Sequence, residues 1–159
     1  VVVIGSSAGG HLSLMLATID PADPLGQTEE LLLTDTLPKA VVGYCPVTTM
    51  SLERDFILSF MGGTREEKAE AYQAASPVDR VKEGVPPLLL LQGDADTTTP
   101  LELVQELHER WQESGGDSTM HIYPGIKHGF GYGVKSEAQK QSLGYIEQFL
   151  NELKQPTNR

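Results

Sequence analysis

The sequence is poor in the features that mark several large classes of protein. It has one cysteine, Cys45, in 159 residues, which excludes a disulfide framework and a zinc site built from several cysteines. It has no run of about eighteen apolar residues, so a membrane-spanning helix is not expected. Its 12 Lys and Arg residues are outnumbered by 22 Asp and Glu residues, and a net charge of -10 repels phosphate backbones and anionic lipids. We therefore expect neither nucleic acid nor a membrane as a partner.

The sequence also lacks an initial methionine and the basic segment that introduces a secretory signal. It opens directly in an apolar run, as if part-way through a sheet. We expect residues 1–159 to form a single domain that lacks its N-terminal strands. A lone cysteine is typical of a cytoplasmic protein, but the compartment stays unknown because a missing N-terminus can hide a signal peptide.

Four short apolar runs are predicted to be strands. Uninterrupted runs of β-branched residues and leucine are typical of strands buried on both faces, and the segments between them are long enough for crossover helices. The pattern predicts an α/β fold: a three-layer α/β/α arrangement around a mostly parallel sheet. The four runs are Val1 to Ile4, Ala40 to Tyr44, Leu88 to Gln92 and Thr119 to Tyr123.

Three residue pairs fit the capping box, in which a hydroxyl and a side chain three residues later satisfy free amides at a helix start. The pairs are Thr64 with Glu67, Thr99 with Glu102, and Ser136 with Gln139. Pro100 is expected at the first position of its helix. Two long stretches, Asp20 to Pro38 and Pro46 to Arg80, are predicted to be loops on the substrate side, the second with one helix near residues 65–75.

The sharpest functional signal is Gly5-Ser6-Ser7-Ala8-Gly9, a G-x-S-x-G pattern between an apolar strand and an apolar helix. A serine at the tip of such a turn is exposed on a strained backbone, and the flanking small residues let strand and helix approach closely. The amide of Ala8 can stabilise the oxyanion that forms when Ser7 attacks a carbonyl group. The alternative is a glycine-rich turn that only joins the two elements or holds a phosphate.

A serine nucleophile needs a base, and the chain has four histidines from which to choose. His128 lies between glycine-containing turns beyond the fourth predicted strand, where the ring can reach a neighbouring loop. The others are less suitable because they lie on helices or inside a strand: His11, His108 and His121. His128 is therefore the predicted base.

The acid that orients the base is expected just after the third strand, where Asp94 and Asp96 both occur. Either aspartate could instead form a turn with its own backbone. Asp96 is preferred because it lies nearer the following helix, and Asp94 stays as the alternative. Since the carboxyl ends of parallel strands meet at one edge of a sheet, the loops that carry Ser7, Asp96 and His128 are predicted to converge there.

Five motifs spread over nearly the whole chain point to a known family. They are Gly5-Ser6-Ser7-Ala8-Gly9-Gly10-His11-Leu12, Tyr44-Cys45-Pro46-Val47, Gln92-Gly93-Asp94-Ala95-Asp96 ending in Pro100, His121-Ile122-Tyr123-Pro124-Gly125 and Lys127-His128-Gly129-Phe130. Together they resemble the α/β-hydrolase esterases of the acetyl esterase and acetyl-xylan-esterase-like kind, a lipase/esterase family.

This resemblance implies a catalytic triad of Ser7, His128 and Asp96 that hydrolyses short-chain esters, often acetyl groups on sugars, with no cofactor and no metal. Such a protein is a serine esterase, or carboxylesterase. Members of the family also carry N-terminal strands and a His-Gly-Gly motif that completes the oxyanion hole, so Ala8 is the one donor that can be named in this sequence. Gln92 stands where a histidine is usual, and Thr99 stands where a valine is usual.

Two other functions stay open at this point. The same loops resemble those of prolyl-oligopeptidase-like serine peptidases. Alternatively, the chain is an inactive fragment or an interaction module whose exposed first strand pairs with another chain, because an unpaired sheet edge is a template for strand addition. Pairing of two copies through that edge makes a homo-oligomer, whereas the esterase hypothesis predicts a small-molecule ester as the partner.

Overall fold

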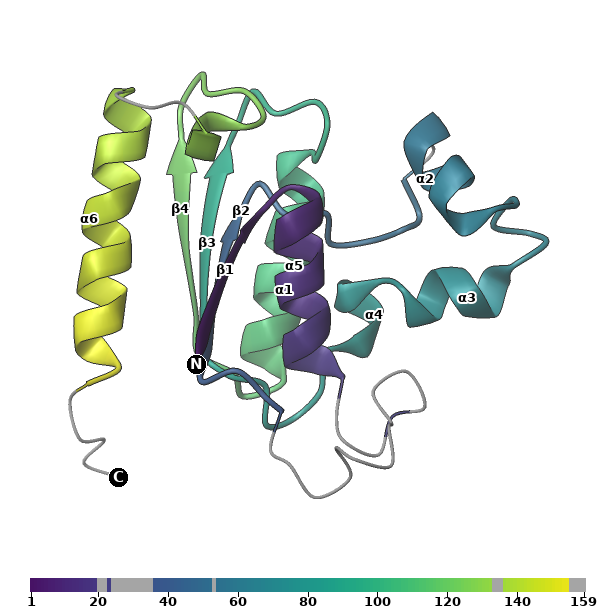
Figure 1. Cartoon of the computed structure of the whole chain (residues 1–159), viewed down its shortest axis with the longest axis horizontal. Helices are drawn as coiled ribbons and strands as arrows, with labels where there is room; N and C mark the ends of the chain where they lie inside the picture. The colour runs from purple at the N-terminus through teal and green to yellow at the C-terminus, as the bar shows by residue number, and fades with distance from the viewer. Residues whose placement is uncertain (20–22, 24–35, 53, 133–135, 155–159) are drawn as a thin grey trace.

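The computed structural model describes residues 1–19, 23, 36–52, 54–132 and 136–154, and Figure 1 shows how they are arranged. Strands and helices alternate along the chain, as the sequence predicts. In chain order the elements are β1 (Val2–Ser6), α1 (Ala8–Thr18), β2 (Ala40–Tyr44), α2 (Asp55–Met61), α3 (Ala69–Ala74), α4 (Pro77–Arg80), β3 (Leu88–Gly93), α5 (Leu101–Glu113), β4 (Ser118–Tyr123), the 3-10 turn η1 (Phe130–Tyr132) and α6 (Glu137–Glu152).

The four strands form one parallel sheet with the order β1-β2-β3-β4. Each predicted strand matches an observed strand to within two residues at either end. Because all the strands run the same way, their carboxyl ends lie at the same edge of the sheet, at the top of Figure 1. The loops after β1, β3 and β4 all begin at this edge, which places the segments of Ser7, Asp96 and His128 near one another.

Helices cover both faces of the sheet, which makes three layers (Figure 1). On β3, Leu89 and Leu91 pack in a cluster with Ile146 and Phe149 of α6. Leu88 and Leu90 point to the other face and pack in a cluster that contains these residues of α1 and α5: Leu14, Ala17, Val104, Leu107 and Trp111. The alternation explains why the strand reads as an uninterrupted leucine run: every residue of β3 is buried.

Two of the three predicted capping boxes form their backbone contact. The Gln139 amide donates to Ser136 Oγ at the start of α6. The Glu67 amide donates to Thr64 Oγ1, but this contact closes a turn, because α3 begins only at Ala69. The prediction for Thr99 is wrong: Pro100 is the residue that precedes the first turn of α5, and no side chain caps that helix. The Thr99 hydroxyl is used elsewhere, in the site described below.

The segment between β2 and β3 holds more helix than the sequence predicts. Instead of one helix near residues 65–75, it contains the three short helices α2, α3 and α4. A small apolar cluster of Val47, Met50, Ile57 and Tyr72 holds α2 and α3 against the start of the segment. The other predicted loop, Asp20 to Pro38, lies mostly outside the described residues.

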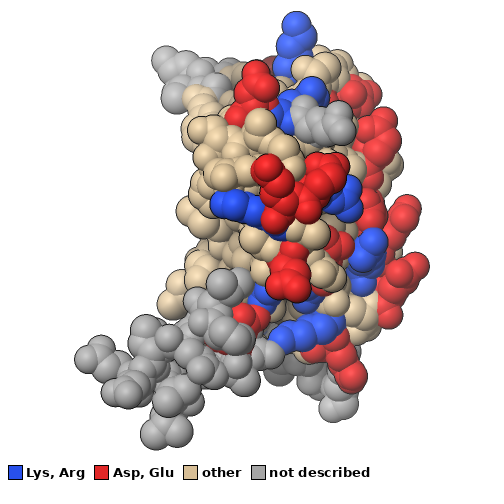
Figure 2. Space-filling view, turned by 90° about the vertical axis from the view of Figure 1, so that its right-hand side faces the viewer, with Lys and Arg blue, Asp and Glu red and all other residues tan. Residues whose placement is uncertain are grey.

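The charged side chains on the face that carries α2 and α3 are mixed. In Figure 2, Lys and Arg side chains are interspersed among Asp and Glu side chains rather than gathered in one basic patch. Such a face offers no extended cationic track for a phosphate backbone. Among the described residues, no helix has the length and apolar character needed to cross a membrane.

Candidate active site

Ser7 lies at the sharp turn between the end of β1 and the start of α1. Its backbone is strained, since a φ of 55° is rare for a residue with a side chain. The Ser7 amide donates a hydrogen bond to the Tyr44 carbonyl of the neighbouring strand, with an N–O distance of 2.9 Å. This bond fixes the turn to the sheet and leaves the Ser7 hydroxyl facing the loops that follow the other strands.

Only one of the two glycines of the pentapeptide is needed for the close packing of β1 against α1. A Cβ atom on Gly5 would lie 2.1 Å from the Gly9 carbonyl oxygen, so β1 and α1 can approach this closely only with glycine at position 5. A Cβ on Gly9 meets nothing within 4 Å, so the prediction that both glycines serve close packing holds only for Gly5. Gly10 takes a comparable role, because a Cβ there would lie 2.8 Å from Pro46 Cβ.

The His128 ring connects the two other predicted residues of the site. Its Nε2 lies 2.8 Å from Ser7 Oγ, and its Nδ1 lies 2.7 Å from Asp96 Oδ2. The Asp96 side chain is fully buried, whereas the His128 side chain is 23% exposed. The ring therefore stands between a buried carboxylate and a hydroxyl that faces the loops at the sheet edge.

Asp96 is held by three hydrogen bonds besides the one to His128. The backbone amides of Thr98 and Thr99 donate to Oδ1 at 2.9 Å each, and the Thr99 hydroxyl donates to Oδ2 at 2.9 Å. Burial acts to raise the pKa of Asp96, but the hydrogen bonds from Thr99 and His128 outweigh it and lower the pKa below its ordinary value of 3.8. The carboxylate is thus ionised at neutral pH, with its position fixed.

Asp94, the alternative acid, does not face the histidine ring. It is exposed, and its Oδ1 accepts a hydrogen bond from the Gly125 amide at 2.6 Å. This bond joins the loop after β3 to the loop after β4, so Asp94 does not close a turn with its own backbone. The structure therefore distinguishes between two aspartates that the sequence left as alternatives.

The other three histidines have structural contacts of their own. His11 is buried, and its Nε2 lies 2.8 Å from the Ala75 carbonyl oxygen, which ties α1 to the end of α3. His108 Nδ1 lies 2.7 Å from Ser118 Oγ. His121 stacks on Tyr145 with a distance of 3.5 Å between ring centroids.

Within the described part of the chain, Cys45 is the one further group near the His128 ring that can bind a metal. Its Sγ and the ligand atoms of Asp96 and His128 all lie within 4.8 Å of one another. Metals bind the thiolate form of cysteine, but burial raises the pKa of this thiol to about 12. Because the hydrogen bonds described above already use the carboxylate and the ring, these three residues are a poor set of metal ligands.

Thr99 is the residue of the site that sequence reasoning missed. The sequence assigns it to a helix cap, whereas its hydroxyl is buried beside Asp96 and also lies 3.3 Å from His128 Nδ1. One signal could have found it: threonine stands where the family it resembles usually has valine. A hydroxyl that replaces a methyl group in a buried position needs a partner, and here the partner is the carboxylate.

The variant Thr99→Val is expected to lower the free energy of unfolding at pH 7 by about 1.5–3 kcal/mol, the usual contribution of a hydrogen bond to a charged group. Losing the donor raises the pKa of Asp96, whose ionised form stabilises the fold above pH 3.8. The deficit should therefore shrink as the pH falls through the lowered pKa of the folded state. Urea unfolding at several pH values measures this effect. Thr99→Ser, which keeps the hydroxyl, is the control, and an equal loss in both variants would contradict the explanation.

A parallel α/β sheet with a strained serine at a strand-to-helix turn, facing a His–Asp pair from two later loops, is the arrangement of the α/β-hydrolase class. Comparisons with known proteins agree with this class. The BD-FAE family model matches residues 1–111, and a second model, described as TAP-like protein, matches residues 67–158. The chain belongs to the BD-FAE family, among the α/β-hydrolase esterases.

Individual relatives are esterases too. Esterase LipC of Mycobacterium tuberculosis is 33% identical over 140 residues, which cover 82% of this chain and 34% of LipC. An acetylxylan esterase of Xylanibacter ruminicola is 22% identical over 159 residues, covering 97% of this chain and 31% of that protein. A butyrate-bound structure of a thermophilic esterase from Thermogutta terrifontis superposes with a TM-score of 0.78 at 26% identity, covering 99% of this chain and 58% of that one. The chain spans about a third of the length of the curated relatives that it matches.

Proposed function

We propose that the protein is a serine carboxylesterase that hydrolyses short-chain esters, with Ser7 as the nucleophile, His128 as the general base and Asp96 as the residue that orients the base. The observation that carries this proposal is the pair of short contacts at the histidine ring, 2.8 Å from Nε2 to Ser7 Oγ and 2.7 Å from Nδ1 to Asp96 Oδ2. Acyl transfer by a serine requires this arrangement, in which the nucleophile contacts the base and the base contacts the acid that orients it.

In the first half of the reaction, Ser7 Oγ attacks the ester carbonyl carbon while His128 Nε2 takes the hydroxyl proton. The negative charge develops on the carbonyl oxygen, where the amide of Ala8, the first residue of α1, is the proposed donor. The tetrahedral intermediate then collapses: the bond to the leaving alcohol breaks, and Nε2 returns the proton to that alcohol. An acyl group now occupies Ser7.

In the second half, a water molecule takes the place of the alcohol. Nε2 removes a proton from the water as its oxygen attacks the acyl carbon, and the same proton then returns to Ser7 Oγ as the carboxylic acid leaves. The ionised Asp96 keeps the Nδ1 proton on the ring and stabilises the imidazolium that forms in both halves. Acetyl esters, including those on sugars, are candidate substrates, an idea supported by the likeness to an acetylxylan esterase.

A fluorophosphonate label tests the central step, because it reacts with a serine only when a base has activated the hydroxyl. We expect one label per chain, located on Ser7 by mass spectrometry of the peptides, and protection by an excess of a short-chain ester. The inactive-module alternative predicts a folded protein that takes no label. Turnover of a p-nitrophenyl ester but not of a peptide p-nitroanilide distinguishes the esterase from the peptidase alternative.

A further inference from the structure

The segment between β2 and β3 forms an apolar pocket directly beside the serine turn. The pocket has a volume of about 270 Å³, and Ala8 and His11 of α1 form part of its lining. Ala8 directly follows Ser7 in the chain, so the pocket lies beside the turn that carries the proposed nucleophile. A methyl group, the whole side chain of an acetyl ester, fills only a small part of such a space.

The other walls of the pocket are hydrophobic. Val47 and Met50, both buried, come from the start of the segment, and Phe56, Ile57 and Phe60 come from α2. Phe56 is 50% exposed and Phe60 is 71% exposed, so two large aromatic rings stand partly in solvent at the edge of the pocket. Exposed aromatic rings beside a reactive group are typical of a surface that binds an apolar ligand.

His11 is the one polar side chain among the described residues of this lining, and its contacts make it a poor partner for a charged ligand. Its Nε2 faces the Ala75 carbonyl oxygen at 2.8 Å. Burial lowers the pKa of His11, although the contact with Ala75 acts in the opposite direction. A neutral ring and hydrophobic walls cannot stabilise a carboxylate on the ligand. The pocket is therefore suited to an uncharged, apolar group.

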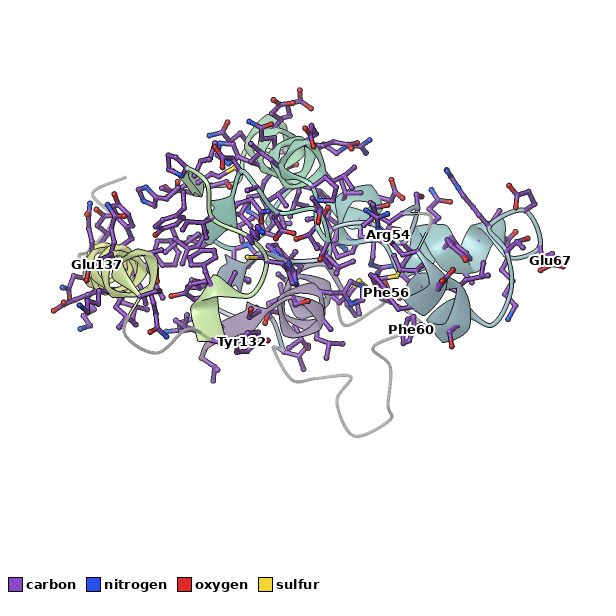
Figure 3. The ribbon with its side chains drawn as sticks, turned by 90° about the horizontal axis from the view of Figure 1, so that it is seen from above. Arg54, Phe56, Phe60, Glu67, Tyr132 and Glu137 are labelled. Carbon is purple, nitrogen blue, oxygen red and sulfur yellow. The ribbon has the colours of Figure 1, made fainter. Side chains whose placement is uncertain are left out.

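The position of the pocket relative to His128 indicates which part of the ester it receives. The leaving alcohol must lie on the His128 side, because Nε2 returns the proton to it. In Figure 3, Tyr132, which lies in η1 just after the His128 loop, is on one side of α1, and Phe56 and Phe60 are on the other. Among the residues that the structure describes, none that lines the pocket comes from the His128 loop. The group that points into the pocket is then the acyl chain.

We infer that this pocket, closed by Phe56 and Phe60 of α2, binds the acyl chain of the ester and gives the enzyme a preference for apolar acyl groups longer than acetyl. The inference rests on the proposed function, since it concerns the substrate of the same serine. It adds to that function a specificity element on α2, a helix that the sequence did not predict. Each methylene group that enters the pocket should raise kcat/KM about fourfold, the fold-change that corresponds to its burial.

The test is a series of p-nitrophenyl esters with one alcohol and increasing acyl length: acetate, butyrate and hexanoate. We expect kcat/KM to rise along the series. Phe60→Ala and Phe56→Ala should each lower the hexanoate-to-acetate ratio of kcat/KM about fourfold or more. Leu58→Ala is the matched control, because Leu58 lies on the same helix, is 47% exposed and does not line this pocket. Thermal unfolding of all three variants shows whether the fold is intact.

If the enzyme is active but kcat/KM does not change with acyl length, the inference is overturned while the proposed function stands. A preference that Phe56→Ala and Phe60→Ala leave unchanged would also overturn it. A second series with acetate as the acid and alcohols from ethanol to hexanol distinguishes the two sides of the ester. If chain length matters there and not in the acyl series, the pocket binds the alcohol and the inference is wrong. Absence of turnover for every ester, with no fluorophosphonate label on Ser7, would instead remove the proposed function itself.

Discussion

Replacing Ser7 with alanine is expected to lower kcat for p-nitrophenyl esters by about six orders of magnitude, the loss found when a triad serine is removed from a serine hydrolase. Without the hydroxyl, no acyl group can be transferred to the protein, and His128 has no proton to remove. The variant keeps the His128 ring but loses the Ser7 oxygen atom, which lies 2.8 Å from Nε2 in the wild type. Steady-state kinetics measures the loss. Active-site titration shows how much wild-type enzyme contaminates the variant.

Ser6→Ala is the matched control for this prediction. Ser6 is the neighbouring residue in the same turn, and its Oγ is buried and has no hydrogen-bond partner among the described residues. Removing that hydroxyl leaves the Ser7 to His128 contact in place, so we expect activity close to that of the wild type. Activity of Ser7→Ala within tenfold of wild type would contradict the role of Ser7, and an equal loss in both variants would indicate damage to the turn.

Asp96→Asn is expected to lower kcat by about 10⁴-fold with a far smaller change in KM, as in other enzymes in which the acid of a triad is made neutral. The amide is similar in shape to the carboxylate, but it cannot stabilise a positive charge on His128. Its NH₂ group also favours the wrong tautomer of the ring. The measurement is kcat and KM at neutral pH, together with circular dichroism to establish that the variant folds.

Asp94→Asn is the control for this second prediction, and it also tests the alternative that the sequence left open. Asp94 is exposed and accepts a hydrogen bond from the Gly125 amide, which an asparagine oxygen can accept as well. We expect little change in kcat. If Asp94→Asn lost activity and Asp96→Asn kept it, the assignment of the acid would be reversed.

The elements that the sequence predicts well are those whose signal lies in a few consecutive residues. The runs that became β2 and β3 are buried on both faces, so most of their residues are apolar and the pattern is plain. The turn at Ser7 is equally local, because a tight strand-to-helix connection needs glycine at position 5 whatever the rest of the fold does.

The features that the sequence predicts poorly depend on how the folded chain packs rather than on a local pattern. Thr99 fits a capping box by spacing, but Asp96 lies within reach of its hydroxyl once the loop folds, and a charged acceptor is a stronger partner than a backbone amide. The short helices α2, α3 and α4 have too few residues to be stable alone. They form where the cluster around Met50 and Tyr72 holds them, and no local pattern reports that packing.

By itself, then, the sequence determined the α/β class, the order of the strands along the chain and the short list of residues suited to serine chemistry, because each depends on residue type and near-neighbour spacing. The tertiary structure alone decided that Asp96 rather than Asp94 faces His128, that Thr99 donates to the Asp96 carboxylate, and that α2 lines an apolar pocket beside the serine turn. The contact between Asp96 and His128 joins residues 32 positions apart, and the pocket joins residues of α1 and α2. Such contacts are set by how the layers pack on the sheet.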